Sequence, residues 1–447
     1  MSGPREVLSD WWQDGLLRRV IRNSSFLFSS NIISAGLSFG QGILAVRLVG
    51  VDGWGLVTTI ITFASNVNRL LTFRMSEVVV KRLGESLPDK RDQAAAAVKT
   101  AMLTEALTSL AAYTILFLLA PWAARLFAKD LQTAPWFIIY GLILLTNLIY
   151  ESSTGVLQAA RRFDWIARIN VIQSALTASL ILAAFLLKGG VLAILLAYVI
   201  GKTFNGIAIG VAAWRELNGM LGPGWWRVPL RVLPEKRSMA SFMLNTNLNG
   251  TVNLVVRDSI PLYLAALMSV TEVGYFKLAQ SLVALVLLPL DPFIWPTYAE
   301  ISSTVGQQQW DLTLRLLRRV STLTAVVVLA VGGGLALTGW WLVPFLYGAA
   351  ALPAYPALLI LLVGFGFASI FQWNRPLMLA LGKPGYPVLI AALVGVLELG
   401  LIFWLVPVHG YLMLAAILSG YLVFSIGITA WRGLKAVRDQ RVHPLSV

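Results

Sequence analysis

Residues 386–431 read YPVLIAALVGVLELGLIFWLVPVHGYLMLAAILSGYLVFSIGITAW. They contain two apolar runs, 386–407 and 410–431, with a glycine, Gly410, where the runs meet and one acidic residue, Glu398. An α-helix needs about 20 mostly apolar residues to cross a hydrocarbon core of roughly 30 Å. Each run is therefore long enough for one membrane span, and the pair predicts two transmembrane helices joined by a tight turn.

The same pattern recurs along all 447 residues. The chain is 57% hydrophobic and only 13% charged, with a mean hydropathy of +0.76, whereas a soluble domain carries about 25% charged residues. We therefore predict an all-α integral membrane protein with 12 transmembrane helices. The predicted spans are 25–47, 54–80, 100–124, 133–157, 168–188, 190–213, 239–265, 273–300, 319–343, 355–380, 386–407 and 410–431.

Two residue types that carry much protein chemistry are scarce. The chain has no cysteine, which excludes disulfides, thiol redox chemistry and cysteine-ligated metals. Its two histidines, His409 and His443, lie outside the predicted spans, so a histidine metal site or catalytic triad is not expected. We predict no cofactor, no metal site and no catalytic residue.

The basic residues predict the orientation. Of 35 lysines and arginines, 25 fall on the side that holds both termini, and four (Arg47, Arg125, Lys129 and Lys188) fall in the opposite loops. Loops rich in Lys and Arg stay in the cytoplasm. We expect a prokaryotic cytoplasmic (inner) membrane protein with both termini cytoplasmic. Its net charge of +14 then reflects orientation and anionic lipids, with no nucleic acid as partner.

A repeat suggests how the spans are grouped. VDGWGL (51–56) and VTEVGY (270–275) lie 219 positions apart, and Gly189 and Gly410 lie 221 apart. This near-constant offset predicts two parallel, pseudo-symmetric six-helix lobes around a central cavity. The expected parts are a segment 1–24 with an interfacial helix (or a solvated tail), an N-lobe 25–214, a linker 215–237, a C-lobe 238–432 and a cytoplasmic tail 433–447.

Six basic residues lie inside the predicted spans. A charge at mid-helix costs about 2.5–3.5 kcal/mol on insertion scales, so each should face a wet cavity or a partner. Snorkelling to lipid phosphates is the alternative for Arg74 and Arg375. The six are Arg69, Arg74, Lys202, Arg257, Lys277 and Arg375.

Two polar faces are expected to line the cavity. In the seventh span, Asn245, Asn249 and Asn253 precede Arg257 at intervals of four residues, which places them on one side of a helix. Hydrogen bonding between helices is the alternative explanation. The first span carries a second face, either a cavity wall or a packing seam, made of Asn31, Ser34, Ser38 and Gln41.

Acidic residues in the spans are candidates for ion coupling. Glu398 stands alone in an apolar run, where desolvation favours a neutral carboxyl, so it is a candidate proton carrier or an acid bonded to a neighbouring helix. Glu77 lies three residues from Arg74 and is able to neutralise it. Asp291 lies between Pro289 and Pro292, which predict a break in the eighth span.

Three segments resemble a known family. VDGWGL, RDSIPLYLAAL (257–267) and TEVGYFKLAQSLVALVLLPLDPFIWPTYAEIS (271–302) are similar to the polysaccharide transporter branch, the Wzx-type oligosaccharide-lipid flippases, of the multidrug/oligosaccharidyl-lipid/polysaccharide exporter (MOP) superfamily. In that family an acid commonly precedes a Gly-Tyr pair entering span eight, as Glu272 precedes Gly274 and Tyr275 here. An aspartate near the end of span seven is also typical, and Asp258 matches it.

The resemblance implies a function. Such flippases move polyprenyl-pyrophosphate-linked oligosaccharides, as used for O-antigen or exopolysaccharide, to the outer leaflet by alternating access with a proton or sodium ion as coupling ion. The six basic residues would bind the pyrophosphate, and Asp258 joins the coupling candidates. Implied partners are the lipid-linked glycan, membrane lipids, and polysaccharide polymerase and chain-length proteins. Alternatives are a cation-coupled multidrug exporter of the same superfamily and, with only short outer loops, a membrane glycan polymerase or ligase.

Overall fold

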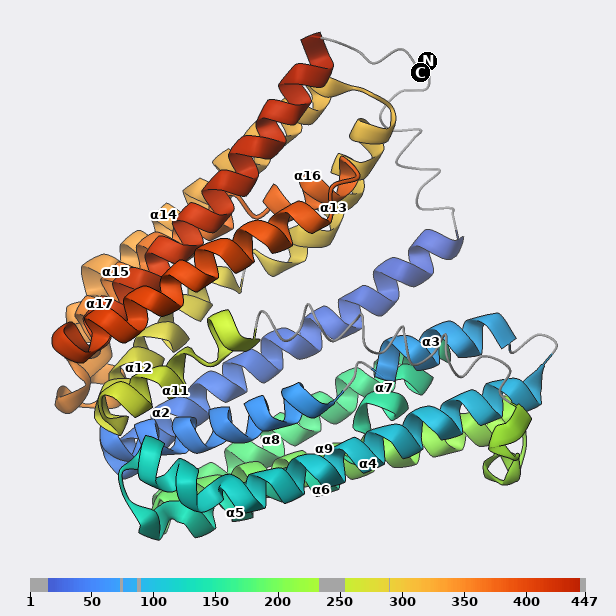
Figure 1. Ribbon diagram of the computed structural model, residues 1–447, viewed down its shortest axis with the longest axis horizontal. Coiled ribbons are helices and arrows are strands. Elements are labelled where there is room, and N and C mark those ends of the chain that lie inside the picture. The colour runs from blue at the N-terminus through green and yellow to red at the C-terminus, as the bar shows by residue number, and fades with distance from the viewer. Residues whose placement is uncertain (1–14, 73–74, 87–89, 233–253, 289, 443–447) are drawn as a thin grey trace. The chain divides into compact units, whose positions relative to one another are not determined.

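The computed structural model describes residues 15–72, 75–86, 90–232, 254–288 and 290–442, with side chains described from Ser29 onward except at 287, 291–293 and 295. Every regular element in these ranges is helical (Figure 1). Large apolar side chains stay exposed along the helices, for example Leu187 at 83% and Trp404 at 73%. Contiguous apolar surface of this kind suits a lipid solvent. The predicted all-α membrane fold is confirmed.

The helices of the first half of the chain are α2 (Gly15–Leu71), α3 (Met75–Ser86), α4 (Arg91–Ala123), α5 (Ala134–Gly141), α6 (Ile143–Thr146), α7 (Tyr150–Ala159), α8 (Phe163–Leu186) and α9 (Val191–Leu221). Those of the second half are α11 (Ile260–Leu267), α12 (Val270–Leu287), α13 (Asp291–Gly306), α14 (Trp310–Tyr347), α15 (Ala354–Ile370), α16 (Asn374–Ala380) and α17 (Gly385–Val442). Single π-helical turns occur at η1 (Ala124–Ala128) and η5 (Leu254–Asp258).

Eight described helical stretches are long and apolar enough to cross a membrane. They are Ser29–Leu71, Arg91–Ala128, Leu131–Ala159, Phe163–Leu186, Val191–Leu221, Trp310–Tyr347, Ala354–Ala380 and Gly385–Arg441. Together they cover ten of the twelve predicted spans, because the first and last stretches each contain two. The predicted seventh span lies mostly outside the described residues. The eighth is divided between α12 and α13, at the break that the prolines predict.

Glycines separate the spans that share one long helix. Gly50 in α2 has φ 73° and Gly410 in α17 has φ 70°, both in the left-handed region that favours glycine. Figure 1 shows the chain reversing direction at the break in α17. The tight turn predicted at Gly410 is therefore present.

The chain divides into two compact units. The first comprises the described parts of Met1–Ala45, Ala64–Trp122 and Gln132–Thr251, and the second those of Val46–Phe63, Ala123–Leu131 and Val252–Val447. The first unit has a core of small and branched side chains from α3, α4, α7 and α9, including Val79, Ala97 and Ile209. In the second unit, α15 packs against α12, α14 and α17.

The repeat-related segments touch each other within the second unit. A Cβ placed on Gly55 would overlap the Val270 carbonyl, and a Cβ placed on Gly274 would overlap the Val51 carbonyl. Gly55 and Gly274 are 219 positions apart, as are Val51 and Val270. The contact is thus reciprocal, as in an isologous pair related by a two-fold axis. Only glycine at both positions lets these two backbones approach so closely.

Two spans are interrupted at matching places. The chain leaves helical geometry between α6 and α7, at residues 147–149, and again between α15 and α16, at residues 371–373. The two breaks are 224 positions apart, close to the offset of the sequence repeat. Interrupted spans expose backbone polar groups inside a membrane, and these groups must find partners within the protein.

Candidate functional site

The π-helical turn η5 presents two charged residues at the end of the seventh span, Arg257 and Asp258. Two side chains further along hold this turn. The backbone N–H and the hydroxyl of Ser259 both donate to the Leu254 carbonyl, at 2.9 and 2.8 Å. The Tyr263 hydroxyl donates to the Val255 carbonyl at 2.9 Å. π-turns inside α-helices frequently occur at functional sites.

The Arg257 side chain is exposed and lies against an aromatic ring. Its guanidinium lies over the Phe365 ring, 5.8 Å from the ring centre, a geometry that permits a cation–π attraction. The neighbouring Val256 is buried against Gly395, where a Cβ would collide with it. This contact fastens η5 to α17 one turn before Glu398.

Glu398 is the acidic counterpart of Arg257. Its side chain is 2% exposed, and neither carboxyl oxygen has a hydrogen-bond partner among the described residues. Arg257 interacts with it electrostatically, and Tyr263 and Tyr421 lie within range of its charge. Arg257, a predicted headgroup ligand, thus lies within electrostatic range of a predicted coupling residue 141 positions away in sequence, with no hydrogen bond between them.

Asp258, the other charged residue of the π-turn, forms a second pair of opposite charges, with Lys277. Asp258 interacts electrostatically with Lys277 on α12, and the Lys277 ammonium donates to the Gln280 side-chain oxygen at 2.9 Å. Lys277 is half-buried. The positive charge of Lys277 is thus compensated by Asp258 within the second unit. The Arg257 side chain, by contrast, is exposed.

The other described basic candidates lie on different helices. Arg69 is in the last turn of α2, Lys202 is on α9 and Arg375 is in the first turn of α16, and all three side chains are exposed. Glu77 on α3 is exposed as well, while its predicted neighbour Arg74 lies outside the described residues. Their predicted roles in binding and coupling stay predictions.

The two predicted polar faces are described unequally. Asn245, Asn249 and Asn253 lie outside the described residues, as does the side chain of Asp291. On α2, Asn31 and Ser38 are exposed, and the buried Ser34 hydroxyl has no hydrogen-bond partner in the described part of the chain. Gln41 is 3% exposed and donates to the Ser174 carbonyl at 2.9 Å, which places it in a contact between α2 and α8.

One arrangement was missed by the sequence reasoning. Glu105 on α4 is 2% exposed, and its two carboxyl oxygens accept the backbone N–H groups of Glu151 and Ser152 at 2.7 and 2.8 Å. These N–H groups begin α7, directly after the interruption of the fourth span. The Ser76 hydroxyl in turn donates to the Glu151 carboxyl at 2.8 Å. The sequence feature that could have indicated this contact is an acidic residue, Glu105, in one predicted span and the polar run YESST (150–154) in the next.

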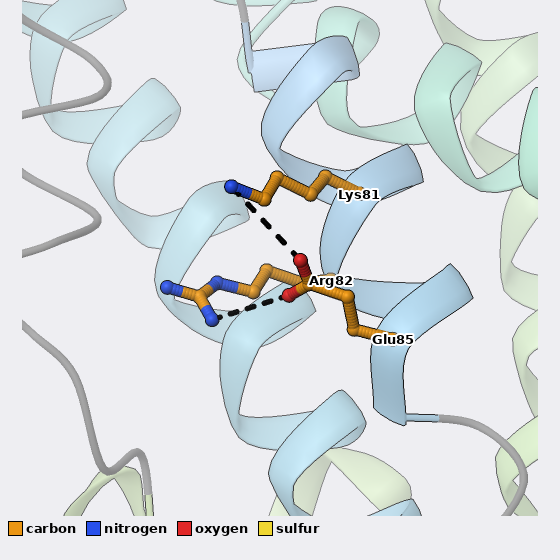
Figure 2. Close-up of polar contacts among 3 residues, drawn as sticks. All are labelled: Lys81, Arg82 and Glu85. Carbon is orange, nitrogen blue, oxygen red and sulfur yellow. Dashed lines mark hydrogen bonds and ion pairs between the residues drawn. The ribbon is translucent and has the colours of Figure 1, made fainter.

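Charges outside the apolar segments form ordinary surface pairs. Figure 2 shows Glu85 between Lys81 and Arg82 on α3, with ion-pair distances of 3.9 and 3.4 Å. Lys81 and Glu85 are about half exposed. Such pairs contribute at most about 1 kcal/mol. They contrast with Glu398, which is buried and has no hydrogen-bond partner in the part of the chain that the structure describes.

Solved structures share this fold over nearly the whole chain. The lipid II flippase MurJ in an inward closed conformation aligns with a TM-score of 0.70 and 15% identity, covering 94% of this chain and 93% of that one. An inward-facing MATE family multidrug resistance transporter aligns at 0.67 and 14%, covering 93% and 96%. A MOP superfamily transporter from Pyrococcus furiosus aligns at 0.65 and 14%, covering 96% of each.

A curated relative matches a shorter stretch. Inner membrane protein YghQ of Escherichia coli K12 is 26% identical over 165 residues, which are 36% of this chain and 45% of that protein. The chain thus spans about half the length of this relative. These findings define the class, a multi-spanning helical membrane protein with the fold of MOP superfamily transporters. Within it, the chain belongs to the polysaccharide biosynthesis protein family, which matches residues 43–356.

Proposed function

We propose that this protein is a flippase for polyprenyl-pyrophosphate-linked oligosaccharide, such as a repeat unit of O-antigen or exopolysaccharide. It works by alternating access in a cytoplasmic (inner) membrane with both termini cytoplasmic, and a proton or sodium ion is its coupling ion. The single observation that supports this most is the exposed Arg257 guanidinium, set by a π-turn at the end of an apolar segment in a polysaccharide biosynthesis family member.

The chemistry of the substrate fits that residue. A pyrophosphate group concentrates negative charge on a few oxygens, and arginine offers several N–H donors in a planar fork that can bind two oxygens at once. The ring of Phe365 supports the guanidinium from one side and leaves its edge for the phosphate. The polyprenyl tail, which is wholly apolar, can remain among the exposed leucines and valines of the helices.

A multidrug exporter is the second candidate, and one observation favours it. Tyr263 and Tyr421 lie within range of the Glu398 charge, and acidic and aromatic residues attract organic cations. Arg257 lies within range of the same charge and repels a cation, which favours the anionic lipid. Transport of a cationic dye that lipid-linked glycan does not inhibit would support the exporter.

The proposal is tested by leaflet transfer. Purified protein is reconstituted into vesicles with a fluorescent polyprenyl-pyrophosphoryl glycan, and transfer is followed under imposed proton and sodium gradients. Wild-type protein should transfer the lipid, Arg257→Ala should lose at least about tenfold in rate, and Arg438→Ala, an exposed arginine near the end of α17, should behave as wild type. Absence of transfer by folded wild-type protein under all gradients would refute the flippase proposal.

A further inference from the structure

The chain that follows α9 packs onto the first unit and places one tryptophan in the core and the next on the surface. Two glycines with φ 88° and 89° turn the chain after α9. Trp225 is 4% exposed and belongs to the core of this unit, and its ring centre lies 5.0 Å from that of Trp214 on α9. Trp226 is 46% exposed. Trp225 therefore anchors the segment, and Trp226 is presented to the surroundings.

Further contacts hold this segment, residues 222–232, in place. The Lys99 ammonium on α4 donates to the Val228 carbonyl at 3.2 Å. The side chains of Val228 and Val232 pack against the same core as Trp225. The segment is thus a packed part of the first unit, and its outward-facing side chains are fixed by it.

Three exposed arginines accompany the exposed indoles. Arg215 follows Trp214 on α9, and Arg231 lies in the helical turn η4 (Leu230–Val232). The Arg227 guanidinium lies over the Trp226 ring, 4.7 Å from its centre, a geometry that permits a cation–π attraction. In the described parts of the chain, no carboxylate pairs with any of these three guanidiniums.

The acidic residues beside this segment are already paired. Arg162 forms ion pairs with Glu216 on α9 at 3.2 Å and with Asp164 on α8 at 3.8 Å. Glu216 is adjacent to Arg215 in sequence, but its carboxylate is engaged by Arg162. The positive charge of Arg215, Arg227 and Arg231 is therefore left for a partner outside the described chain.

We propose that Trp214, Trp226, Arg227 and Arg231, here called the tryptophan–arginine surface, form a docking site for the headgroups of anionic phospholipids. An indole has an apolar ring and one polar N–H, so its favoured place is the headgroup level of a membrane. A guanidinium held on a ring presents its N–H donors to phosphate oxygens and stays charged.

Charge complementarity decides which lipid occupies the surface. Phosphatidylglycerol carries a net negative charge, whereas the phosphate of phosphatidylcholine is balanced by its own ammonium group. Unpaired arginines near a membrane surface therefore favour the anionic lipid. The site does not depend on the flippase function, and it ties to the lipid the segment through which the chain leaves the first unit.

A local fluorescence measurement tests this proposal. Because the natural chain has no cysteine, Pro229→Cys, an exposed position between the two arginines, accepts a single fluorophore. The labelled full-length protein is placed in phosphatidylcholine nanodiscs with equal small fractions of nitroxide-labelled phosphatidylglycerol or nitroxide-labelled phosphatidylcholine. Quenching by the anionic lipid should be at least about twofold stronger, and the difference should vanish near 1 M salt, where the Debye length falls to about 3 Å.

Paired charge variants locate the preference. Arg227→Gln combined with Arg231→Gln should make the two lipids equal quenchers. Arg315→Gln combined with Arg318→Gln removes the same charge from exposed positions on α14 and should leave the preference unchanged.

Three results would overturn the proposal. The first is equal quenching of the labelled protein by both lipids while the native arginines are present. The second is no quenching by either lipid, which would leave the surface to a soluble acidic partner. The third is a preference that persists without Arg227 and Arg231. If that double variant does not fold, the lipid comparison and its salt dependence in the protein with native arginines decide alone.

Discussion

At the residue scale, Arg257 and Glu398 are two charged side chains in apolar segments, and Glu398 is buried while Arg257 is exposed. Each was predicted individually, because a charge in an apolar run is conspicuous and costly. Their association was not predictable, since the two residues are 141 positions apart and no local pattern reports which helices meet. For Gln41, the helical spacing was compatible with a cavity wall or with a packing seam. In the structure its amide donates to the Ser174 carbonyl, a contact that no local sequence pattern specifies.

Arginine geometry at position 257 should matter beyond its charge. Arg257→Lys keeps the positive charge but loses the planar fork that engages two phosphate oxygens. We expect the apparent affinity for lipid-linked glycan to fall by roughly tenfold, about 1.4 kcal/mol, with the protein still folded. Transport rates at several substrate densities measure this. A lysine variant with wild-type affinity would show that a point charge is sufficient.

Glu105 is predicted to be a stability residue. Its carboxylate satisfies two N–H groups where α7 begins, and buried donors left without partners cost about 1–3 kcal/mol. Glu105→Leu should therefore lower the midpoint of thermal unfolding in detergent clearly, and Glu105→Gln, which retains one acceptor oxygen, should lower it less. Equal midpoints for Glu105→Leu and wild type would contradict this.

At the element scale, hydrophobicity predicted the spans well because lipid leaves the backbone few alternatives to helix. The breaks were harder to predict. Pro289 and Pro292 signalled the division between α12 and α13, whereas the interruption at residues 147–149 contains neither proline nor glycine. The π-turn at Leu254–Asp258 was not predicted either; the Ser259 and Tyr263 hydroxyls hold it, and Val256 packs against Gly395 there.

The contact between the repeat-related helices makes a further prediction. Gly55→Ala and Gly274→Ala should each destabilise the protein by roughly 1–3 kcal/mol, because the added methyl overlaps a backbone carbonyl and forces the helices apart. Gly42→Ala, before the break at Gly50 in α2 and with open space around it, is the control. Thermal unfolding of the three variants checks this. Similar midpoints for Gly55→Ala and Gly42→Ala would mean that the close approach does not occur in the membrane.

At the scale of the whole molecule, the sequence predicts features that the fold alone does not test. Two lobes with a central cavity were predicted from a repeat of about 220 positions, and the reciprocal glycine contact is consistent with that repeat. The orientation rests on charge alone.

The absence of cysteine from the natural chain makes the orientation directly testable. A single cysteine at Ser446, in the predicted cytoplasmic tail, should react with a membrane-impermeant maleimide only after the cells are opened. A cysteine at Leu131, which is 46% exposed between the third and fourth predicted spans, should react in intact cells. The opposite labelling pattern would reverse the predicted topology.

In the proposed function, the Arg257 guanidinium selects a pyrophosphate headgroup for transfer between leaflets. Reconstituted protein is given two fluorescent polyprenyl lipids with the same sugars, one with the pyrophosphate and one with an uncharged linkage, and transfer of each is measured. We expect transfer of the pyrophosphate lipid alone, and Arg257→Ala should abolish it. Equal transfer of both lipids, or transfer that survives this substitution undiminished, would contradict it.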